Sequence, residues 1–516
     1  MYVAGQKEMQ AMDRYTIEKI GLPGAVLMEN AGAKMVEEIV ASTSQPHPQI
    51  MVLIGSGNNG GDGFVIARRL FDLGFKPIVC LLIDPARIRG DAKVHWNVYK
   101  NRDFPIFHIE KEHLDKLQNK MSEADIIVDA ILGTGIKGAV REPLAQIIKM
   151  VNQHANKKMI ISVDIPSGVA SDDGSVEGVA IQATKTISFV FPKKGFFLQA
   201  GPQYIGVWKT VDISVPPSIV GKLGLNMPKL ITESLIQASL PKRPINGHKG
   251  TFGHVLVLGG SRSFIGAPTF AAKAALFGGA GLVSLAIPET IYEIVASQHP
   301  EFLYLPLAEK DGHFSCEAVT QLSGKLPQYD TIVIGPGMSR FSEGEKWLED
   351  LFNELQGQSV VVDADALFLL RNQMDLIRAY KGDVIFTPHP GEMANLLNCS
   401  IKDVEEKRLE IAESFARDNR LYLVLKGHRT IIATPDGNMY INPHGHDALG
   451  KGGSGDVLAG LIASFSAQAV TAESAIITAT YLHAKSGEDQ AKTLSHYGVT
   501  PPDLLEGVRR QLNELT

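Results

Sequence analysis

The stretch LGKGGSGDVLAG, from Leu449 to Gly460, decides how the second half of this chain folds. Its glycines let the backbone approach a ligand closely, and apolar residues at helical spacing follow Asp456. A helix that begins here offers unpaired N–H groups and the positive end of its dipole, which favours a phosphate group. No Ser or Thr follows Lys451, so the stretch is not a Walker A loop. It predicts an anion site whose carboxylate, Asp456, takes a proton from an attacking hydroxyl; the plainer alternative is a helix start with an acidic first turn.

The residues before this stretch alternate between expected strands and helices. Apolar strands are expected at 254–258, 282–287, 331–334, 360–363, 383–386 and 421–425, with a helix of small residues at 269–280. Polar loops follow four of them: GPGMS (335–339), DADA (363–366), TPHPGE (387–392) and KGHRT (426–430). Ligands of open α/β sheets bind at the carboxyl ends of the strands, so these loops are expected to meet the glycine-rich stretch at one site.

The first half of the chain predicts a second α/β domain. Strands are expected at 50–54, 77–83, 125–131 and 159–164, and helices at 64–73, 90–101 and 141–154. Nearly all-apolar strands that alternate with helices are typical of a parallel sheet covered on both faces. Polar loops again follow strands: GSGNNGGDG (55–63), LGTGIKGA (132–139) and DIPSGV (164–169). Residues 165–215 are β-rich, and a Pro/Lys-punctuated tail places the linker near 226, which predicts domains 1–226 and 227–516.

The segment Gly55–Gly60 fits the G-x-G-x-x-G fingerprint of dinucleotide-binding sites, with Asp84 at the end of the next strand. However, Asn58, Asn59 and Asp62 load this turn with side-chain oxygens and amides. A turn that binds pyrophosphate needs bare backbone. Side-chain oxygens and amides instead suit a hard cation and a polar substrate. A turn without chemistry is the remaining alternative.

Two aspartates, Asp129 and Asp164, end strands of the first sheet. Either one alone is commonly the N-cap of the following segment. Two on one sheet edge favour a site, because a carboxylate partly withdrawn from water has a pKa that can be tuned for acid/base work.

The composition excludes several classes of protein. Charged residues make up 21%, hydrophobic residues 44%, and the net charge is −6, which describes a soluble globular protein with no pull toward nucleic acid or membranes. The three cysteines are odd in number and far apart, so we expect no disulfide framework and a reducing compartment. The N-terminal residues lack an apolar signal segment, and the uncharged run 457–472 is short for a membrane span. The expected location is cytoplasmic.

The histidines give weaker signals. His389 lies between two prolines after a strand, where a lone histidine is more often a cap or core residue than a catalytic one. The segment His444-Gly-His446-Asp447 has metal-ligating residue types but not the spacing of a known site. We interpret it as a polar loop.

Several motifs, taken together, resemble those of the bifunctional NAD(P)H-hydrate repair enzymes: NNGGDG, DIPSG, HKGTFGHVLVLGG (248–260), GPGM, TPHPGEM and GGSGD. The resemblance covers nearly the whole chain, in order. It implies a Rossmann-like three-layer N-terminal epimerase domain followed by a ribokinase-like α/β dehydratase domain. The first would interconvert the R and S hydrates of NADH and NADPH, and the second would return the S hydrate to NAD(P)H with ADP and Mg²⁺, giving AMP and phosphate. It also implies a homo-oligomer, a tetramer or larger; the sequence itself does not separate ADP from ATP.

The resemblance assigns roles to individual residues. Asp164 and Asp456 would be catalytic. In the first domain the hydrate would contact Asn58, Asn59, Gly60, Gly61, Asp62, Gly133, Thr134, Gly135, Ile136, Lys137, Gly138, Ala139 and Asp164, and K⁺ would be held by Asn59, Asp129 and Ser167. In the second domain Gly337, His389 and Asp456 would contact the hydrate, and Lys426, Gly427, His428, Arg429, Thr430 and Gly455 the nucleotide. His444, His446 and Asp447 depart from the residues that relatives more often carry there.

The chemistry of these residues agrees with that activity. One carboxylate, Asp164, poised near neutral pH can serve as both acid and base for epimerisation. Hydroxide is a poor leaving group, so conversion to a phosphate helps it leave, and Asp456 with the amides of 452–455 would promote that transfer. Three alternatives stay open: a ribokinase-type small-molecule kinase with an N-terminal nucleotide-binding module, an NAD-dependent dehydrogenase built on Gly55–Gly60, and a non-enzymatic nucleotide sensor or scaffold.

Overall fold

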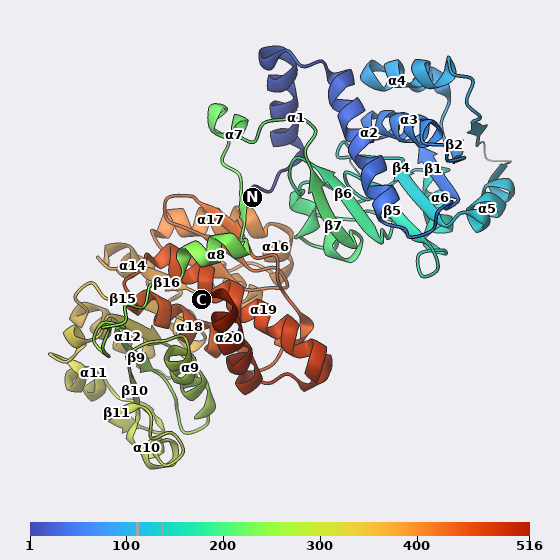
Figure 1. Ribbon diagram of the computed structural model, residues 1–516. Helices are drawn as coiled ribbons and strands as arrows, with labels where there is room; N and C mark the ends of the chain where they lie inside the picture. Colours follow the sequence, from blue (N-terminus) through green and yellow to red (C-terminus); the bar gives the residue numbers. More distant parts are fainter. Residues whose placement is uncertain (110–112, 137) are drawn as a thin grey trace. The chain divides into compact units, whose positions relative to one another are not determined.

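The computed structural model describes residues 1–109, 113–136 and 138–516, which divide into two compact units, Met1–Pro228 and Lys229–Thr516 (Figure 1). The division falls close to the boundary expected near residue 226. Within the described ranges, no helix combines the length and the apolar character needed to cross a membrane. The α/β class expected for both halves is confirmed.

The described part of unit 1 contains one seven-stranded sheet with the order β3-β2-β1-β4-β5-β6-β7, in which every neighbouring pair is parallel. The strands are β1 (Ile50–Ile54), β2 (Ile78–Leu81), β3 (Phe107–His108), β4 (Ile126–Ala130), β5 (Met159–Val163), β6 (Lys185–Phe189) and β7 (Val207–Val211). The strand order reverses between β1 and β4, so the loops after these two strands diverge and leave a crevice where ligands of such folds bind.

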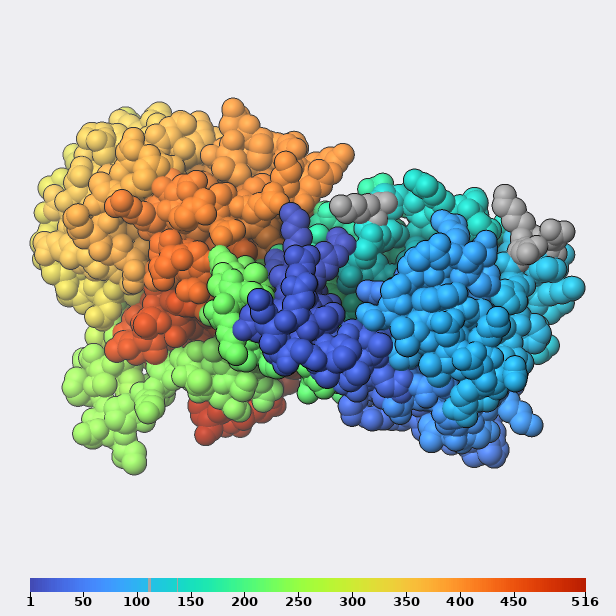
Figure 2. Space-filling model, turned by 90° about the horizontal axis from the view of Figure 1, so that it is seen from above, coloured from blue at the N-terminus to red at the C-terminus, as the bar shows by residue number. Residues whose placement is uncertain are grey.

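Helices cover both faces of this sheet, as expected from its apolar strands. Along β1, Ile50, Val52 and Ile54 pack in one core with α1–α4, while Met51 and Leu53 pack in a second core with α5 and α6. Seen from above, α1 (dark blue) and α4 (light blue) lie on the visible face of unit 1 (Figure 2). The helical segments are α1 (Gln6–Tyr15), η1 (Thr16–Ile20), α2 (Gly24–Ala41), α3 (Asn58–Asp72), η2 (Pro85–Arg87), α4 (Gly90–Lys100), α5 (Leu114–Glu123), α6 (Leu144–Asn152), η4 (Lys194–Phe196), η5 (Gly201–Gln203) and α7 (Ile219–Lys222).

Unit 2, every residue of which is described, contains a ten-stranded sheet with the order β11-β10-β9-β14-β15-β16-β17-β18-β19-β8. From β11 to β17 the neighbouring strands are parallel, and β18 runs antiparallel to β17 and β19. The strands are β8 (Lys229–Leu230), β9 (His254–Leu258), β10 (Leu282–Pro288), β11 (Leu303–Leu307), β14 (Thr331–Ile334), β15 (Ser359–Val362), β16 (Val384–Phe386), β17 (Tyr422–Leu425), β18 (Ile431–Ala433) and β19 (Met439–Ile441), with a separate hairpin of β12 (Glu309–Lys310) and β13 (His313–Phe314).

A hydrophobic core of unit 2 lies between one face of this sheet and the helices α9, α18, α19 and α20. Close packing of α18 on α9 depends on small residues, since a Cβ at Gly460 would lie 2.1 Å from the carbonyl oxygen of Ala271. The helical segments are α8 (Glu233–Ser239), α9 (Gly266–Phe277), α10 (Glu289–Ala296), α11 (Cys316–Leu322), η6 (Leu326–Gln328), α12 (Gly344–Glu354), α13 (Asp365–Leu370), α14 (Met374–Ala379), α15 (Pro390–Leu397), α16 (Ile401–Glu406), α17 (Arg408–Asn419), η7 (Asp447–Leu449), α18 (Ser454–Ala467), α19 (Ala472–Gly498) and α20 (Pro501–Leu515).

Candidate functional site

A cavity of about 560 Å³ opens in unit 1 at the carboxyl ends of β1, β4 and β5. The loop after β1 and the loop after β4 form its walls, which is the crevice expected from the strand order. Helices α1 and α2 contribute the remaining wall. Of the residues predicted to contact a substrate here, those that line the cavity are Asn58, Asn59, Asp62, Gly133, Thr134, Gly135, Ile136 and Asp164.

The described lining of this cavity does not include Gly60, Gly61, Gly138 or Ala139, which we had also expected there. A Cβ at Gly60 would lie 2.0 Å from the carbonyl oxygen of Gly55, so this glycine lets α3 begin directly against the end of β1. A Cβ at Gly61 would lie 2.3 Å from the sulfur of Met28. Both glycines therefore serve packing. Lys137, the remaining predicted contact, lies outside the described residues.

The carboxylate of Asp164 is nearly buried at the end of β5 and is held by three donors. Its Oδ1 accepts hydrogen bonds from the backbone N–H of Phe189 at 3.0 Å, from Ser188 Oγ at 3.1 Å and from Lys193 Nζ at 2.5 Å. The backbone of Asp164 has φ 62°, in the left-handed region that a side-chain-bearing residue seldom adopts. The strained turn aims the carboxylate at the cavity that it lines.

Lys193 is a buried site residue that was not predicted from the sequence. This side chain is 1% exposed, and its ammonium group also donates to Ser188 Oγ and to the carbonyl oxygens of Phe189 and Phe191. All of its hydrogen-bonding capacity is thus satisfied around one carboxylate, which makes the buried charge tolerable. A lysine within the apolar stretch that follows the strand at 185–189 was the available signal.

Two further carboxyl groups, Asp13 and Asp62, line the same cavity. Burial, with a smaller contribution from the negative charge of Asp164, raises the pKa of Asp13 to about 6. Burial and the charges of Asp164 and Asp13 raise the pKa of Asp62 well above its usual range. The site therefore pairs a lysine-bound carboxyl group, Asp164, with two carboxyls whose pKa values are raised. Asp13 lies on α1, far in the sequence from any glycine-rich loop, and no local motif identifies it.

The predicted cation ligands Asp129, Ser167 and Asn59 are connected by hydrogen bonds: Ser167 binds Asp129, and both Ser167 and Asn59 donate to the carbonyl oxygen of Leu132. The carboxylate of Asp129 is fully buried, accepts hydrogen bonds from Ser162 Oγ and from the backbone and hydroxyl of Ser167, and burial raises its pKa. Among the described residues, the groups bonded to this carboxylate are neutral. A buried carboxylate with neutral donors and neighbouring oxygens suits a monovalent cation.

Asp84, which the dinucleotide-binding alternative would place on a ribose, has another role. Its Oδ1 accepts from the backbone N–H of Ala86 at 2.8 Å and caps the short helix η2. It does not belong to the described cavity lining. Asp84 therefore does not supply the acidic side chain that would bind the ribose in a dinucleotide-binding site.

A second cavity, of about 680 Å³, opens in unit 2 at the carboxyl ends of β15, β16 and β17 and at the start of α18. The glycine-rich stretch forms one wall, and Gly453, the residue before α18, has φ 92°. A side chain there would be strained, and its Cβ would also lie 2.7 Å from Pro501. Of the residues predicted to bind hydrate or nucleotide, those that line this cavity are His389, Lys426, Gly427, His428, Thr430, Gly455 and Asp456.

Asp456 lies in the first turn of α18 near a second buried ion pair. Burial, then the negative charge of Asp363, raise the pKa of Asp456 to about 7, against a lowering effect of Lys426. Lys426 Nζ donates to Asp363 Oδ1 at 2.8 Å, and that partner was not assigned a role from the sequence. A carboxyl with a pKa near neutrality can accept a proton from a hydroxyl at physiological pH.

His389 caps a helix, as the plainer prediction had it, and its ring also lines the cavity. Its Nδ1 accepts from the backbone N–H groups of Gly391 and Glu392, and so caps α15. The ring is 57% exposed, and its Nε2 lies 3.5 Å from Glu392 Oε1.

Gly337 and Arg429 do not line this fully described cavity, although we had expected both to contact a ligand. Gly337 has φ 64°, and a Cβ there would lie 2.9 Å from Phe264, so the turn and its packing require glycine. The guanidinium of Arg429 donates to the carbonyl oxygen of Pro443 and lies 3.6 Å from Glu488. Arg429 thus contacts Pro443, after β19, and Glu488, on α19, and not the interior of the cavity.

His483 lines the second cavity and was missed by the sequence analysis because it lies within α19. Its Nε2 lies 3.1 Å from Ser454 Oγ and 2.9 Å from the carbonyl oxygen of Ser454. Burial lowers its pKa to about 4, so the ring is neutral at pH 7. The contact anchors the first turn of α18.

Two family models match this chain. The one described as NAD(P)H-hydrate dehydratase matches residues 255–510, and the one described as YjeF-related protein N-terminus matches residues 24–195.

Curated relatives match the chain over its length. The bifunctional NAD(P)H-hydrate repair enzyme Nnr of Moorella thermoacetica is 38% identical over 98% of this chain and 96% of the relative. The protein of the same name from Dictyoglomus turgidum is 31% identical over 100% and 99%. Among solved structures, the ADP/ATP-dependent NAD(P)H-hydrate dehydratase of Bacillus subtilis, co-crystallised with ATP and Mg²⁺, is 29% identical with a TM-score of 0.49, over 57% of this chain and 100% of that one.

Proposed function

This chain belongs to the family of bifunctional NAD(P)H-hydrate repair enzymes, and from that membership we infer its function. Unit 1 interconverts the R and S hydrates of NADH and NADPH. Unit 2 dehydrates the S hydrate to NAD(P)H with ADP as the phosphoryl donor, and releases AMP and phosphate. The observation that carries this proposal is the second cavity, where a carboxyl with a pKa of about 7 stands at a glycine-rich helix start.

The dehydration needs a base and an anion site, and unit 2 offers both. Asp456 takes the proton of the ring hydroxyl while the hydroxyl oxygen bonds to the terminal phosphorus of ADP. The bond between this phosphorus and the AMP oxygen breaks at the same time. Backbone N–H groups at the start of α18 stabilise the charge on the transferring group. Lys426, held by Asp363, adds positive charge beside it. The ring nitrogen then expels phosphate, and loss of a proton from the adjacent ring carbon completes NAD(P)H.

The residues around Asp456 also fit a divalent cation that arrives with the nucleotide. Negative carboxyl groups of Asp363 and Glu392 raise the pKa of Asp456, whereas a single ammonium group, Lys426, opposes them. This surplus of negative charge next to a phosphate site is unfavourable unless a cation offsets it. Mg²⁺ bound to the phosphates would supply that charge and polarise the phosphorus.

Epimerisation in unit 1 needs proton transfer to and from the hydroxyl oxygen on the ring carbon. We propose that the carboxyl of Asp13 donates a proton to this oxygen, so that water leaves while the ring nitrogen forms a double bond to the carbon. Water then adds to the other face of the ring, and Asp164, held by Lys193, takes the proton that this water releases. The new hydroxyl lies on the opposite face, so the centre is inverted.

Potassium is the cation that we propose for the cluster of Asn59, Asp129 and Ser167 in unit 1. Asn59, Asp129 and Ser167 would hold it, and the neutral surroundings of the buried Asp129 carboxylate support this proposal. A bound K⁺ would offset that charge and fix the loops after β1 and β4. We further propose that the protein is cytoplasmic. We also propose that it is a homo-oligomer of four or more chains, and light scattering measures this number directly.

The activity is tested by adding the chain to hydrated NADH with ADP and Mg²⁺ and following the near-ultraviolet absorbance of NADH. Return of the absorbance with one AMP and one phosphate per NADH supports the proposal. A phosphorylated product that accumulates without NADH would instead indicate a ribokinase-type kinase. Activity without any nucleotide would contradict the mechanism of unit 2.

A further inference from the structure

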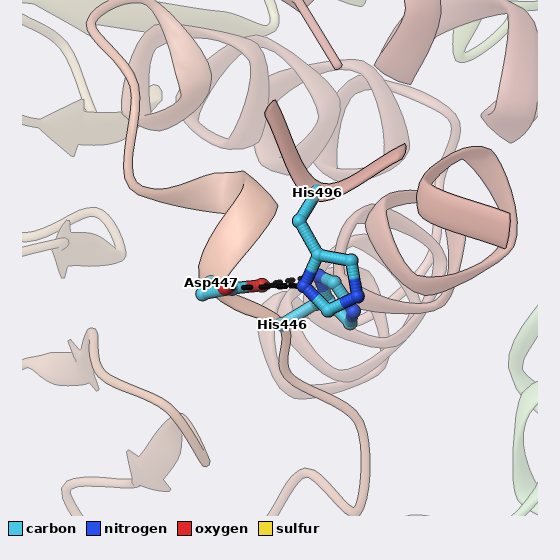
Figure 3. Close-up of side chains that lie close together, drawn as sticks. All are labelled: His446, Asp447 and His496. Atoms are coloured by element: carbon cyan, nitrogen blue, oxygen red, sulfur yellow. Dashed lines mark hydrogen bonds and ion pairs between the residues drawn. The ribbon is translucent and has the colours of Figure 1, made fainter. Parts of the chain in front are cut away.

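Two histidines and an aspartate gather beside the second cavity (Figure 3). They are His446, Asp447 and His496, and each offers one donor atom within 4.8 Å of the others. Figure 3 shows both imidazole rings turned toward the same carboxylate. From the sequence, the first two belong to a segment interpreted as a polar loop, because its spacing is not that of a known metal site; the third residue comes from a distant part of the sequence.

The backbone brings His496 to this place by a break in α19. Ser495 has φ 64° and ψ 165°, which is not helical, and the residue after it leaves the path of the helix. His446 and Asp447 begin the short helix η7 at the cavity wall. The same two segments are joined a second time where Lys451 Nζ donates to the carbonyl oxygen of Tyr497.

The contacts of the cluster converge on the carboxylate of Asp447. His446 Nδ1 lies 2.8 Å from Asp447 Oδ1, and His496 Nδ1 lies 3.0 Å from Oδ1 and 3.2 Å from Oδ2 of the same side chain. The backbone N of Ala448 also lies 3.1 Å from His446 Nδ1. A cation bound by the two imidazoles and the carboxylate would replace these hydrogen bonds.

The ligand set identifies the class of cation. Two imidazole nitrogens and one carboxylate oxygen suit borderline metals such as Zn²⁺, Co²⁺ or Ni²⁺, and leave coordination positions open to water. Mg²⁺ prefers oxygen ligands, so the ion that accompanies a nucleotide is a poor competitor here. With metal–ligand distances of about 2.0–2.2 Å and tetrahedral angles, ligand atoms lie roughly 3.4 Å apart, so the contacts of 2.8 and 3.0 Å to Asp447 need to open by about half an ångström.

We propose that His446, Asp447 and His496 form a binding site for a divalent transition-metal ion. The metal would fasten η7 to the end of α19. Because His446, Asp447 and Lys451 also line the second cavity, the metal would order the wall against which a ligand of that cavity packs. The site stands on its own geometry and does not depend on the reaction proposed for that cavity.

Cobalt binding to the full chain tests this proposal. The protein, stripped of metal with a chelator, is titrated with Co²⁺, and the visible absorption of the ion is recorded. We expect one Co²⁺ per chain, with an affinity at least about tenfold weaker in His496→Ala and in Asp447→Asn. His248→Ala, which removes an exposed histidine of the same unit, should bind as wild type does.

The controls separate this site from other causes. Both side chains changed at the cluster are largely exposed, so circular dichroism should match the wild-type spectrum. Excess Mg²⁺ should leave the Co²⁺ spectrum unchanged. No Co²⁺ spectrum in the wild-type protein, equal affinity in the two cluster variants, or displacement by Mg²⁺ would each overturn the proposal.

Discussion

The ammonium nitrogen of Lys193 lies 2.5 Å from Oδ1 of Asp164 in the interior of unit 1, and both residues are buried. The pair explains how a carboxylate is kept in a cavity lined also by two carboxyls with raised pKa values. Removal of the lysine would leave an uncompensated negative charge, which costs more than the pair contributes to stability.

Lys193→Met should therefore destabilise unit 1 by roughly 3–5 kcal/mol and abolish epimerisation. Chemical unfolding followed by circular dichroism measures the first effect. Lys209→Ala removes a lysine that is 57% exposed from its pair with Glu38, which keeps Lys185 as a partner, and should cost less than about 1 kcal/mol. Equal stability of the Lys193→Met and wild-type proteins would refute this account of the pair.

Asp13→Asn should slow epimerisation by roughly 10²-fold, because the amide cannot deliver a proton. The pKa of Asp13, raised to about 6 by burial, sets a limb in the pH profile. The acid form is lost as the pH rises through about 6, so the wild-type rate should fall there, and the variant should lack that limb. A limb that persists in the variant belongs to another group and excludes Asp13 as the acid.

The dehydration rate should rise with pH through about 7 and then level off, because only ionised Asp456 accepts a proton. Lys426 lowers the pKa of Asp456, so Lys426→Met should move this limb to higher pH as well as slow the reaction. Rates measured across pH with saturating ADP check both effects. If Lys426→Met leaves the pH of this limb unchanged, the pH dependence of the rate arises from a group other than Asp456.

Asp456 should also reduce stability at alkaline pH. Its pKa is about 7 in the folded protein and 3.8 ordinarily, so the folded state binds this proton more tightly. The resulting stability is present below about pH 4 and is lost as the pH rises to about 7. The free energy of unfolding of Asp456→Asn should hence exceed that of the wild-type protein by about 1–3 kcal/mol at pH 8, and this difference should disappear near pH 4. A wild-type protein that is the more stable at pH 8 would contradict the assigned environment.

Potassium should raise the melting temperature of unit 1, whereas Li⁺ at equal concentration should not. Ser167→Ala removes a proposed ligand and should suppress this difference. Ser171→Ala, a buried serine of the same segment whose hydroxyl contacts Thr134, should retain it. Identical melting in both salts would leave the Asp129 cluster without its proposed cation.

Much of this architecture follows from local sequence. The apolar runs at Ile50–Ile54 and Thr331–Ile334 form strands with the expected bounds, since each is buried on both faces. The polar loops meet at the sheet edges because parallel strands end on the same side. What escaped prediction depends on tertiary contacts: Asp13 and His483 lie on helices with no local motif, and Gly60, Gly61 and Gly337 serve packing that only the fold reveals.

The most direct test of the central claim is the recovery of NADH from a mixture of R and S hydrates by the wild-type chain and two variants. With ADP and Mg²⁺, the wild-type protein should convert the whole mixture. Asp164→Asn should stop after the S fraction, and addition of Asp456→Asn, itself inactive in dehydration, should restore full conversion. Complete conversion by Asp164→Asn alone, at the wild-type rate and under conditions where the hydrates do not epimerise spontaneously, would contradict the division of labour between the two units.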